Sequence, residues 1–291
     1  MSRIALVTCR PAPQISVDLD LPLIAEELER GGADVTVACW DDPEVDWGSY
    51  DLAVIRSTWD YSWRRDEFLD WAVRCAAETR LANPVEVLRW NTDKRYLGDL
   101  LRAGVPTVPT RYIAPGEVPE LPVDGEYVIK PASGAGARYA ARYTDAERDT
   151  ALRHLARMHA EGLTAMIQPY VAGIEATGER AVLFYGGDFL HSIRKGAVLA
   201  AGVPYDEKKV AHPALEAWQP TDAEFAVARA ALDAVPGGVE QLLYARVDLV
   251  DGVDGQPCVM ELELVEPNLF LKAVHPASLP VVATAILKAA G

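Results

Sequence analysis

Cysteine and long hydrophobic runs are both scarce in this sequence. The chain has 291 residues but only four scattered cysteines, Cys9, Cys39, Cys75 and Cys258, which form no CxxC pair. The spacing indicates neither a zinc site nor a disulfide framework, and it favours reduced thiols in a cytoplasm. No apolar run reaches the roughly 18 residues that a membrane-spanning helix needs. The short stretch Ile4–Val7 predicts a buried first strand rather than a signal peptide.

Positive charge is also in short supply. The 28 lysines and arginines are outnumbered by 43 acidic residues, which gives a net charge of -15. Because phosphate backbones and anionic lipid surfaces attract basic faces, this balance excludes nucleic acid and membrane surfaces as expected partners. It does not exclude ATP, since a few local cations and a metal can hold a triphosphate inside an acidic protein. The length allows two or three domains and leaves the oligomeric state open, a homo-oligomer included.

Strand-like and helix-like segments alternate along the first ninety residues. The apolar runs are Ile4–Cys9, Val35–Cys39 and Leu52–Ile55, and the segments with helical spacing are Leu21–Arg30 and Arg64–Glu78. Alternating strands and helices are typical of an open α/β domain with a parallel sheet. We therefore predict an N-terminal α/β domain over residues 1–90.

The rest of the chain predicts two α+β subdomains, 91–171 and 172–291. In the first we expect a helix at Thr92–Ala103 capped by Asn91 or Thr92, strands at Glu126–Lys130 and Ala165–Pro169, and a helix at Asp145–Glu161. In the second we expect strands at Arg180–Tyr185, Phe189–Ile193, Leu243–Val250 and Val259–Leu264, and helices at Thr221–Val235 and Ala277–Ala289. The stretch 196–219 has no regular pattern and is a candidate mobile loop.

The strongest chemical signal is a pair of strands near the C-terminus. Side chains alternate across a strand, so Arg246 and Asp248 share one face, and Glu261 and Glu263 share one face of the next strand. If the register brings those faces together, three carboxylates converge and repel one another unless a cation lies among them. Hard oxygen ligands suit Mg²⁺, which usually also takes phosphate oxygens. The structural alternative is a solvated sheet face with a salt bridge.

A second motif joins a lysine to a loop of small residues. Lys130 ends a predicted buried strand, and Ser133, Gly134 and Gly136 follow within six residues. Small residues let backbone N–H groups approach phosphate oxygens closely, and the lysine adds a positive charge. The pattern is neither a Walker A loop nor a dinucleotide fingerprint. Taken alone, it also fits a flexible surface turn.

Two weaker motifs flank this loop. Lys94 lies at a predicted helix start, where its charge opposes the helix dipole unless an anion is bound nearby. The segment Gln168–Val171 contains Pro169, which donates no N–H and can leave neighbouring backbone groups free for a flat heterocycle. A solvent-facing lysine and a kinked edge strand are the structural alternatives.

In this order, the motifs resemble the ATP-grasp superfamily over roughly residues 1–291. The resemblance implies an open parallel sheet followed by two subdomains that clamp ATP. It assigns Lys94 and Lys130 to the α- and β-phosphates. The small-residue loop, with Ser133, Gly134 and Gly136, would close over the phosphates. The adenine would be held by the backbone of Gln168, Pro169, Tyr170 and Val171.

The same resemblance assigns the C-terminal strands to two Mg²⁺ ions and to transition-state support. Arg246 and Asp248 match the RxD pattern of the superfamily, and Glu261 and Glu263 match its ExN pair. The departure is Glu263 in place of the usual Asn, and a carboxylate there should still bind metal. A second alignment puts Glu263 at the Glu position and leaves the role of Glu261 open.

The resemblance also assigns two further basic residues. Arg180 and Lys195 resemble the side chains that reach the γ-phosphate and the acyl phosphate. Arg194 could take the place of Lys195, because adjacent strand residues face opposite sides.

A closer resemblance is to a bacterial subgroup of ATP-grasp cyclo-ligases that close O-ureido-D-serine to D-cycloserine. It is carried by the segments Arg56–Tyr61 and Glu261–Pro267. It implies a small amino-acid-like substrate and a role in antibiotic biosynthesis. The carboxyl ends of parallel strands usually border the ligand crevice, so Arg56 is the candidate for the substrate carboxylate and Asp60 for its amine. We expect Glu266 and Asn268 to contact the substrate as well. The alternative is that this aromatic segment only packs and that Arg56 pairs with an acid.

The expected reaction is activation of a carboxylate as an acyl phosphate, followed by attack of an amine. Charge builds on phosphoryl oxygens, which Mg²⁺, Lys130 and Arg246 would neutralise. The specific expectation is ring closure of O-ureido-D-serine with release of ADP and phosphate, with the irregular stretch 196–219 as a lid. Two rivals remain open: an intermolecular dipeptide or glutathione-like ligase, and a non-catalytic nucleotide-binding regulatory protein.

Overall fold

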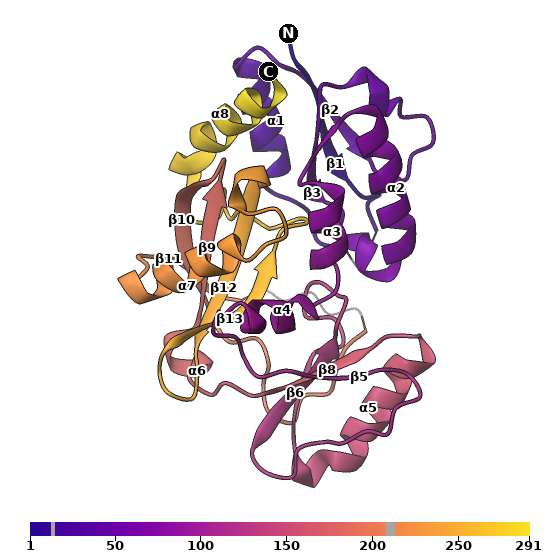
Figure 1. Ribbon diagram of the computed structural model, residues 1–291, viewed down its shortest axis with the longest axis vertical. Helices are drawn as coiled ribbons and strands as arrows, with labels where there is room; N and C mark the ends of the chain where they lie inside the picture. Colours follow the sequence, from indigo (N-terminus) through magenta and orange to yellow (C-terminus); the bar gives the residue numbers. More distant parts are fainter. Residues whose placement is uncertain (13–14, 208–212) are drawn as a thin grey trace.

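The computed structural model describes residues 1–12, 15–207 and 213–291, and three sheets organise them (Figure 1). The first sheet has the order β2-β1-β3-β4, and all its strands are parallel. Its strands are β1 (Arg3–Thr8), β2 (Asp34–Cys39), β3 (Leu52–Ser57) and β4 (Arg80–Ala82). Helices α1 (Leu21–Arg30) and α2 (Arg65–Glu78) connect them. The predicted open parallel sheet is confirmed, apart from the short β4, whose three residues are too few to give a periodic signal.

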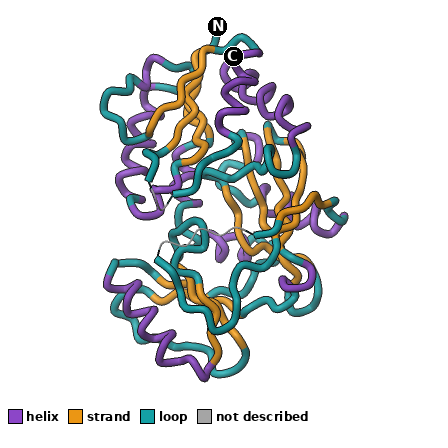
Figure 2. Tube along the Cα trace, turned by 180° about the vertical axis from the view of Figure 1, so that it is seen from behind, coloured by secondary structure: helices purple, strands orange, loops and turns teal. Residues whose placement is uncertain are grey.

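The second sheet is antiparallel and has the order β5-β8-β6-β7. Its strands are β5 (Arg111–Ile113), β6 (Glu126–Pro131), β7 (Ala141–Thr144) and β8 (Ala165–Pro169), and α5 (Arg148–Ala160) packs on one face. Figure 2 shows this sheet and its helix at the end of the molecule opposite the two termini. Lys130 therefore stands near the end of a central strand, directly before the small-residue loop.

The third sheet, with the order β11-β10-β9-β12-β13, is antiparallel. Its strands are β9 (Glu179–Tyr185), β10 (Asp188–Lys195), β11 (Leu215–Trp218), β12 (Tyr244–Asp251) and β13 (Pro257–Glu263). Helix α7 (Asp222–Asp233) covers one face, with Ala228 and Leu232 packing against Val247 and Leu249. The sequence predicted four of these strands but not β11, which forms within the stretch taken as irregular. Residues 208–212 of that stretch lie outside the described residues.

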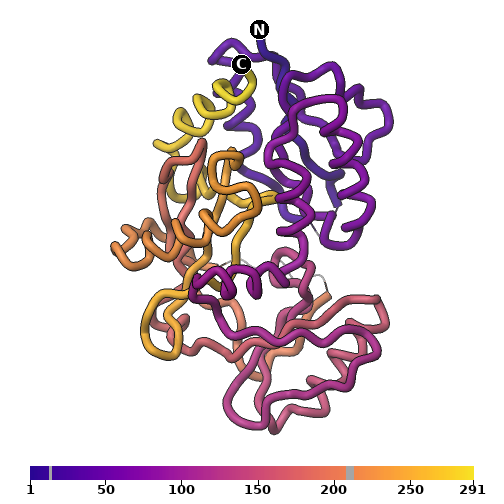
Figure 3. The backbone as a smooth tube through the Cα atoms, in the orientation of Figure 1, coloured from indigo at the N-terminus to yellow at the C-terminus, as the bar shows by residue number. Residues whose placement is uncertain are grey.

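The first and third sheets share one hydrophobic core. Ile4 and Ile24 pack with Leu183 and with Ile286 of α8 (Leu279–Ala290) in a single buried cluster. Helix α8 lies against α1, so both ends of the chain are close together (Figure 3). The mixed α/β fold is thus one in which the last helix closes back onto the first domain. The domain limits at 90 and 171 stay a prediction.

The predicted helix at Thr92–Ala103 is wrong in its boundaries. Two shorter helices, α3 (Val85–Asn91) and α4 (Tyr96–Arg102), are joined by a turn that carries Lys94. Asn91 does not cap a helix, because its side chain donates to the carbonyl of Leu262 and accepts from the N–H of Leu264. These long-range hydrogen bonds fix the turn against β13 and compete successfully with capping.

Within the described residues, the helices are too short or too polar to cross a membrane.

One buried histidine gives the fold a testable pH dependence. His154 on α5 is 0% exposed, stacks on Tyr205 at 4.1 Å between ring centroids, and is hydrogen-bonded to the hydroxyl of Tyr143. Burial lowers its pKa from 6.5 to about 4. The unfolded chain therefore binds a proton more readily than the folded chain between these values. The resulting stabilisation is complete above pH 6.5 and is lost as the pH falls toward 4.

We expect His154→Phe to flatten the acid side of the stability profile. The ring remains stacked but cannot take up a proton, so wild type should lose about 3 kcal/mol more than the variant between pH 7 and pH 4. Urea unfolding midpoints at several pH values measure the difference. Parallel profiles for the two proteins would show that this imidazole does not contribute.

Candidate active site

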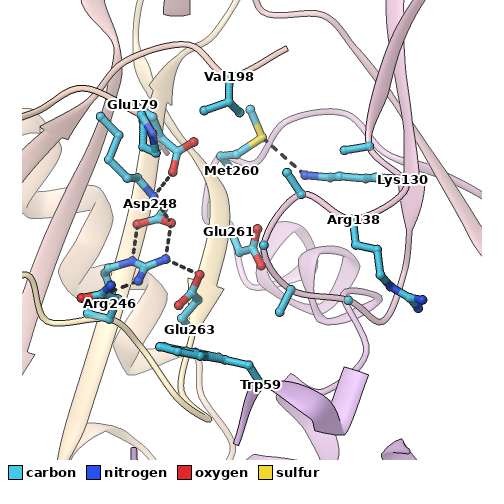
Figure 4. Close-up of a pocket in the computed structure, with 18 of the residues that line it drawn as sticks. Trp59, Lys130, Arg138, Glu179, Val198, Arg246, Asp248, Met260, Glu261 and Glu263 are labelled. Carbon is cyan, nitrogen blue, oxygen red and sulfur yellow. Dashed lines mark hydrogen bonds and ion pairs between the residues drawn. The ribbon is translucent and has the colours of Figure 1, made fainter. Parts of the chain in front are cut away.

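A cavity of about 820 Å³ is bordered by strand residues of the second and third sheets and by residues of the first domain that lie outside its sheet, among them Trp59 and Tyr61. The hairpin β12–β13 forms one wall (Figure 4). Cavities of this size at domain junctions are the usual place for small-molecule sites. Most predicted site residues border this cavity. They are Lys94, Lys130, Gly134, Gly136, Gln168, Pro169, Tyr170, Val171, Lys195, Arg246, Asp248, Glu261, Glu263, Glu266 and Asn268.

The hairpin register brings the predicted faces together. Arg246 is opposite Glu263, and Asp248 is opposite Glu261. Arg246 makes two hydrogen bonds to Asp248, of 2.9 and 3.0 Å, and a third to the Glu263 carboxylate. Its remaining Nη1 donates to the backbone oxygen of Asn268 at 3.3 Å. Four of the five N–H donors of the guanidinium are thus engaged, which holds it in the wall of the cavity.

Two lysines complete an alternating array of charges. Lys195 Nζ lies 2.7 Å from Asp248 and also contacts Glu179. Lys94 Nζ lies 3.0 Å from Glu261 and donates to the backbone oxygen of Gly134 at 2.6 Å. Each carboxylate of the hairpin therefore has a cationic neighbour.

The array does not balance the charge of all its carboxylates. Burial alone would raise the pKa of Asp248, but Arg246 and Lys195 outweigh it and hold that pKa below its usual range. By contrast, burial together with Asp248 and Glu261 raises the pKa of Glu263 to about 7, despite Arg246. Burial and the nearby Glu263 raise the pKa of Glu266 to about 8. A further cation in the cavity would stabilise these ionised carboxylates.

The predicted metal ligands are not gathered into one compact site. Among residues 1–12, 15–207 and 213–291, no three His, Cys, Asp or Glu side chains gather closely enough to form a metal site alone. Asp248, Glu261 and Glu263 are instead drawn to Arg246 and the lysines. Their chemistry still suits Mg²⁺, because hard oxygens stand on one face beside lysines, and phosphate oxygens usually complete its coordination.

The predicted phosphate-binding residues surround the small-residue loop. Lys94 reaches this loop through its contact with Gly134, while Lys130 Nζ has only a distant contact, 3.9 Å from the sulfur of Met260. Burial lowers the pKa of Lys130, and the charge of Lys94 adds to this effect although Glu261 opposes it. Ser133 donates to the backbone oxygen of Thr92 at 2.6 Å, so its side chain anchors the loop rather than facing the cavity.

The predicted adenine segment stands at the end of β8. Gln168 is buried and donates to the hydroxyl of Thr110 at 2.9 Å. Tyr170 stacks under the guanidinium of Arg142 at 3.6 Å and donates to Glu175. These contacts fix the two side chains, and the whole segment Gln168–Val171 borders the cavity.

The choice between the two adjacent basic residues of β10 is settled by strand alternation. Lys195 borders the cavity, whereas Arg194 pairs with Glu216 on β11 and lies over Trp218. The register places Lys195 opposite Glu179, which also borders the cavity. The sequence analysis missed Glu179, although strand alternation with Arg180 could have indicated it.

Arg180 is not brought to the cavity, so its predicted contact with phosphate is wrong. It is 2% exposed and faces the opposite side of the sheet from Glu179. Its guanidinium pairs with Glu224 on α7 at 2.7 Å and with Asp251. Arg180 therefore ties the sheet to its covering helix.

We expect Arg180→Met to reduce stability rather than catalysis. Removing one partner of a buried ion pair leaves Glu224 without its counter-charge and should cost about 3 kcal/mol of unfolding free energy. The kcat of the folded variant should stay within about threefold of wild type. Urea unfolding and ADP release measure the two effects. An inactive variant with wild-type stability would restore Arg180 to the catalytic set.

The two residues of the first domain predicted to hold the substrate, Arg56 and Asp60, do not border the cavity either. Arg56 is 0% exposed, lies 3.4 Å from Asp18 and donates to the backbone oxygen of Pro267. Asp60 accepts from the indole of Trp40 at 2.8 Å and lies 3.4 Å from Arg64. Neither residue borders the cavity, so neither can hold a substrate carboxylate or amine directly. Burial in the first domain explains the error.

The neighbours of these anchors border the cavity instead. Trp59 and Tyr61, which the alternative interpretation treated as packing residues, line it together with Arg138 and Lys272. Trp59 donates to the backbone oxygen of Glu266 at 3.4 Å, which joins the first domain to the segment after the hairpin. Trp59 and Tyr61 lie in a short 3₁₀ helix, and Arg138 and Lys272 lie in turns. Strand or α-helix periodicity cannot identify residues in such segments.

Comparisons with known proteins identify the family of this chain. Residues 4–83 match the family model for the N-terminal domain of the D-cycloserine synthetase DcsG. The cycloserine biosynthesis protein DcsG of Streptomyces lavendulae is 38% identical over 286 residues, which cover 93% of each chain. A crystal structure of D-cycloserine synthetase DcsG has a TM-score of 0.86 and 34% identity, and covers 99% of this chain and all of that one.

Two more distant structures share the fold alone. D-alanine–D-alanine ligase from Bacillus anthracis, complexed with ATP, has a TM-score of 0.68 and 15% identity, and covers 100% of this chain and 97% of that one. The ATP-grasp ligase PsnB, complexed with a precursor variant, Mg and ADP, has a TM-score of 0.65 and 17% identity, and covers 100% of this chain and 99% of that one. The chain therefore belongs to the D-cycloserine synthetase family and shares the fold of ATP-grasp ligases.

Proposed function

We propose that this enzyme uses ATP to close O-ureido-D-serine into the ring of D-cycloserine. The observation that carries the ligase chemistry is that the lysines Lys94 and Lys130 and the carboxylates of the β12–β13 hairpin border one cavity. The full-length likeness to DcsG, whose name refers to cycloserine biosynthesis, supports the choice of substrate. We also propose a cytoplasmic location, where ATP is available.

In this proposal, a different group of cavity residues binds each part of ATP. The backbone of Gln168–Val171 would hold the adenine, and Lys94, Lys130 and the loop at Gly134 would hold the phosphates. Asp248, Glu261 and Glu263 would hold two Mg²⁺ ions. When bound, these ions would neutralise charge on the phosphoryl oxygens. The raised pKa of Glu263 supports this, because its carboxylate lacks sufficient positive charge nearby.

The residues of this chain would then orient the substrate and exclude water. A substrate carboxylate oxygen attacks the γ-phosphorus, the bond to the bridging oxygen of ADP breaks, and an acyl phosphate forms. The substrate nitrogen attacks the acyl carbon and expels phosphate, which keeps the former carboxylate oxygen. D-cycloserine lacks the carbamoyl group of the substrate, so one water molecule must hydrolyse that group, which leaves as carbon dioxide and ammonia. Binding within the cavity would shield the acyl phosphate from hydrolysis.

Intramolecular attack has an entropic advantage, because the nucleophile is already tethered to the acyl group. The rival is a ligase that joins two separate molecules. O-Ureido-D-serine alone, with ATP and Mg²⁺, should release ADP and give a product with the mass of D-cycloserine. If ADP appears only after a second amine is added, the intermolecular rival is correct. If no candidate carboxylate releases ADP although nucleotide binds, the regulatory rival is favoured.

A further inference from the structure

The cations that border the cavity differ in how they are paired. They are Lys94, Lys130, Arg138, Lys195, Arg246 and Lys272. Three of these, Lys94, Lys195 and Arg246, each lie within 3.0 Å of a carboxylate oxygen of the hairpin. Across the part of the chain that the structure describes, no acidic side chain forms an ion pair with the other three. The unpaired cations are the natural places for anionic ligand groups.

Arg138 is the most unusual of the three, because it is buried. Its exposed fraction is 8%, and its Nε has no hydrogen-bond partner among the described residues. Burial lowers the pKa of this guanidinium. By contrast, Lys272 is exposed, and Lys130 stands beside the phosphate-binding Lys94. The charges of Glu161 and Glu207 partly oppose this effect, but neither forms an ion pair with the guanidinium of Arg138 among the described residues. A buried cation without an ion pair is costly, and an anion bound in the cavity offsets that cost.

The surroundings of Arg138 hold it in place before any ligand arrives. Its guanidinium lies over the ring of Trp63 at 5.1 Å and over that of Tyr139 at 4.9 Å. The backbone on both sides is in the left-handed region, with φ of 61° at Ala137 and 59° at Tyr139. Such strain in non-glycine residues persists only where the surrounding structure imposes it, and it occurs often at ligand sites.

Arg138 also stands apart from the hairpin cations. In Figure 4 it lies on the side of the cavity opposite Arg246, with Glu261 and Glu263 between them. Four of the five N–H donors of Arg246 are occupied by Asp248, Glu263 and the backbone of Asn268. Arg246 is therefore poorly placed to be the first binding partner of an incoming carboxylate, whereas the planar fork of a free arginine matches a carboxylate well.

We propose that Arg138 binds the carboxylate of the amino-acid substrate and so positions it for phosphoryl transfer. This inference rests on the proposed function, which supplies the class of substrate. A phosphate of the nucleotide offers the same anionic oxygens, but Lys94, Lys130 and the small-residue loop already provide for that group. Trp63 comes from the first domain, so the stacked arginine also places the substrate where that domain meets the small-residue loop.

The test compares an acid with its neutral analogue. Binding of O-ureido-D-serine and of its carboxamide is measured by calorimetry in the presence of ADP and Mg²⁺, so turnover is not required. Wild type should prefer the acid by at least about 10-fold, since a charge-assisted hydrogen bond is lost with the amide. Arg138→Gln should remove the preference, and Arg138→Lys should restore part of it. Arg153→Gln, an exposed arginine on α5, serves as the control and should behave as wild type.

Each result leads to a different conclusion. A preference for the acid that survives in Arg138→Gln overturns the role of Arg138 and leaves the proposed function standing. If Arg138→Gln instead weakens ADP binding and keeps the preference for the acid, Arg138 binds the nucleotide rather than the substrate carboxylate, and the inference is wrong. If wild type does not bind the acid at all, the proposed function fails, and the carboxylate anchor fails with it.

Discussion

Replacing Asp248 with asparagine is expected to lower kcat at least ~100-fold, because in our proposal it removes a carboxylate that would hold Mg²⁺ beside the transferred phosphoryl group. Asp248 is 2% exposed and joins Arg246 and Lys195 on one sheet face. Asparagine has the same size but cannot balance either cation, so the variant disturbs the array without emptying the space. Steady-state ADP release measures the effect.

Stability must be measured beside activity in this variant. Because Arg246 and Lys195 lose a buried counter-charge, the free energy of unfolding should also fall, by about 3 kcal/mol. Circular dichroism identifies the temperature range in which the variant is folded. Asp254→Asn changes an acid in the exposed turn of the same hairpin and should leave kcat unchanged. Full activity of the folded Asp248 variant would remove this residue from the metal set.

Replacing Lys130 with methionine should separate nucleotide binding from folding. Among the described residues, the ammonium group of Lys130 makes no ion pair, and its hydrogen-bond partner is the sulfur of Met260 at 3.9 Å; burial lowers its pKa. Its loss should therefore leave the stability of the free protein unchanged or slightly higher. Thermal stabilisation by an ATP analogue with Mg²⁺, worth about 2.7 kcal/mol at 100 Kd in wild type, should largely disappear.

The matched control for this experiment is Lys288→Met. Lys288 is exposed on α8, far along the chain from the cavity residues, and the variant should keep the full stabilisation by nucleotide. ADP release should fall at least ~100-fold in Lys130→Met and remain normal in the control. A Lys130 variant with an unchanged nucleotide shift would contradict the assignment of this lysine to the phosphates.

Local periodicity and spacing predicted the parts of the site that belong to regular strands. Arg246 and Asp248 share one face of β12, and Glu261 and Glu263 share one face of β13, as strand alternation predicts. The two faces meet because the register shifts by one residue between Asp248 and Leu249, a β-bulge that the sequence did not reveal. Strand alternation also separates Lys195 from Arg194 once the register with Glu179 is known. The sequence alone could not choose between those two, since alternation fixes opposite faces but not which face meets the cavity.

The errors come from contacts between residues far apart in the sequence. Arg56 looked like a ligand anchor, but it is buried between Asp18 and the backbone of Pro267, 211 residues away. Asn91 looked like a helix cap, but it pairs with the backbone of β13. In each case a partner that local patterns do not reveal satisfies the polar group. Arg138 is the opposite case. Only the structure shows that it is buried and that its Nε has no hydrogen-bond partner among the described residues.

The most direct test of the account follows an oxygen atom. The substrate is O-ureido-D-serine labelled with ¹⁸O in its carboxylate, and the phosphate released with ADP is analysed by mass spectrometry. If the carboxylate is activated as an acyl phosphate, each phosphate formed carries one labelled oxygen from the substrate. Labelled product together with unlabelled phosphate would mean that ATP is hydrolysed by water, and it would contradict carboxylate activation in this cavity.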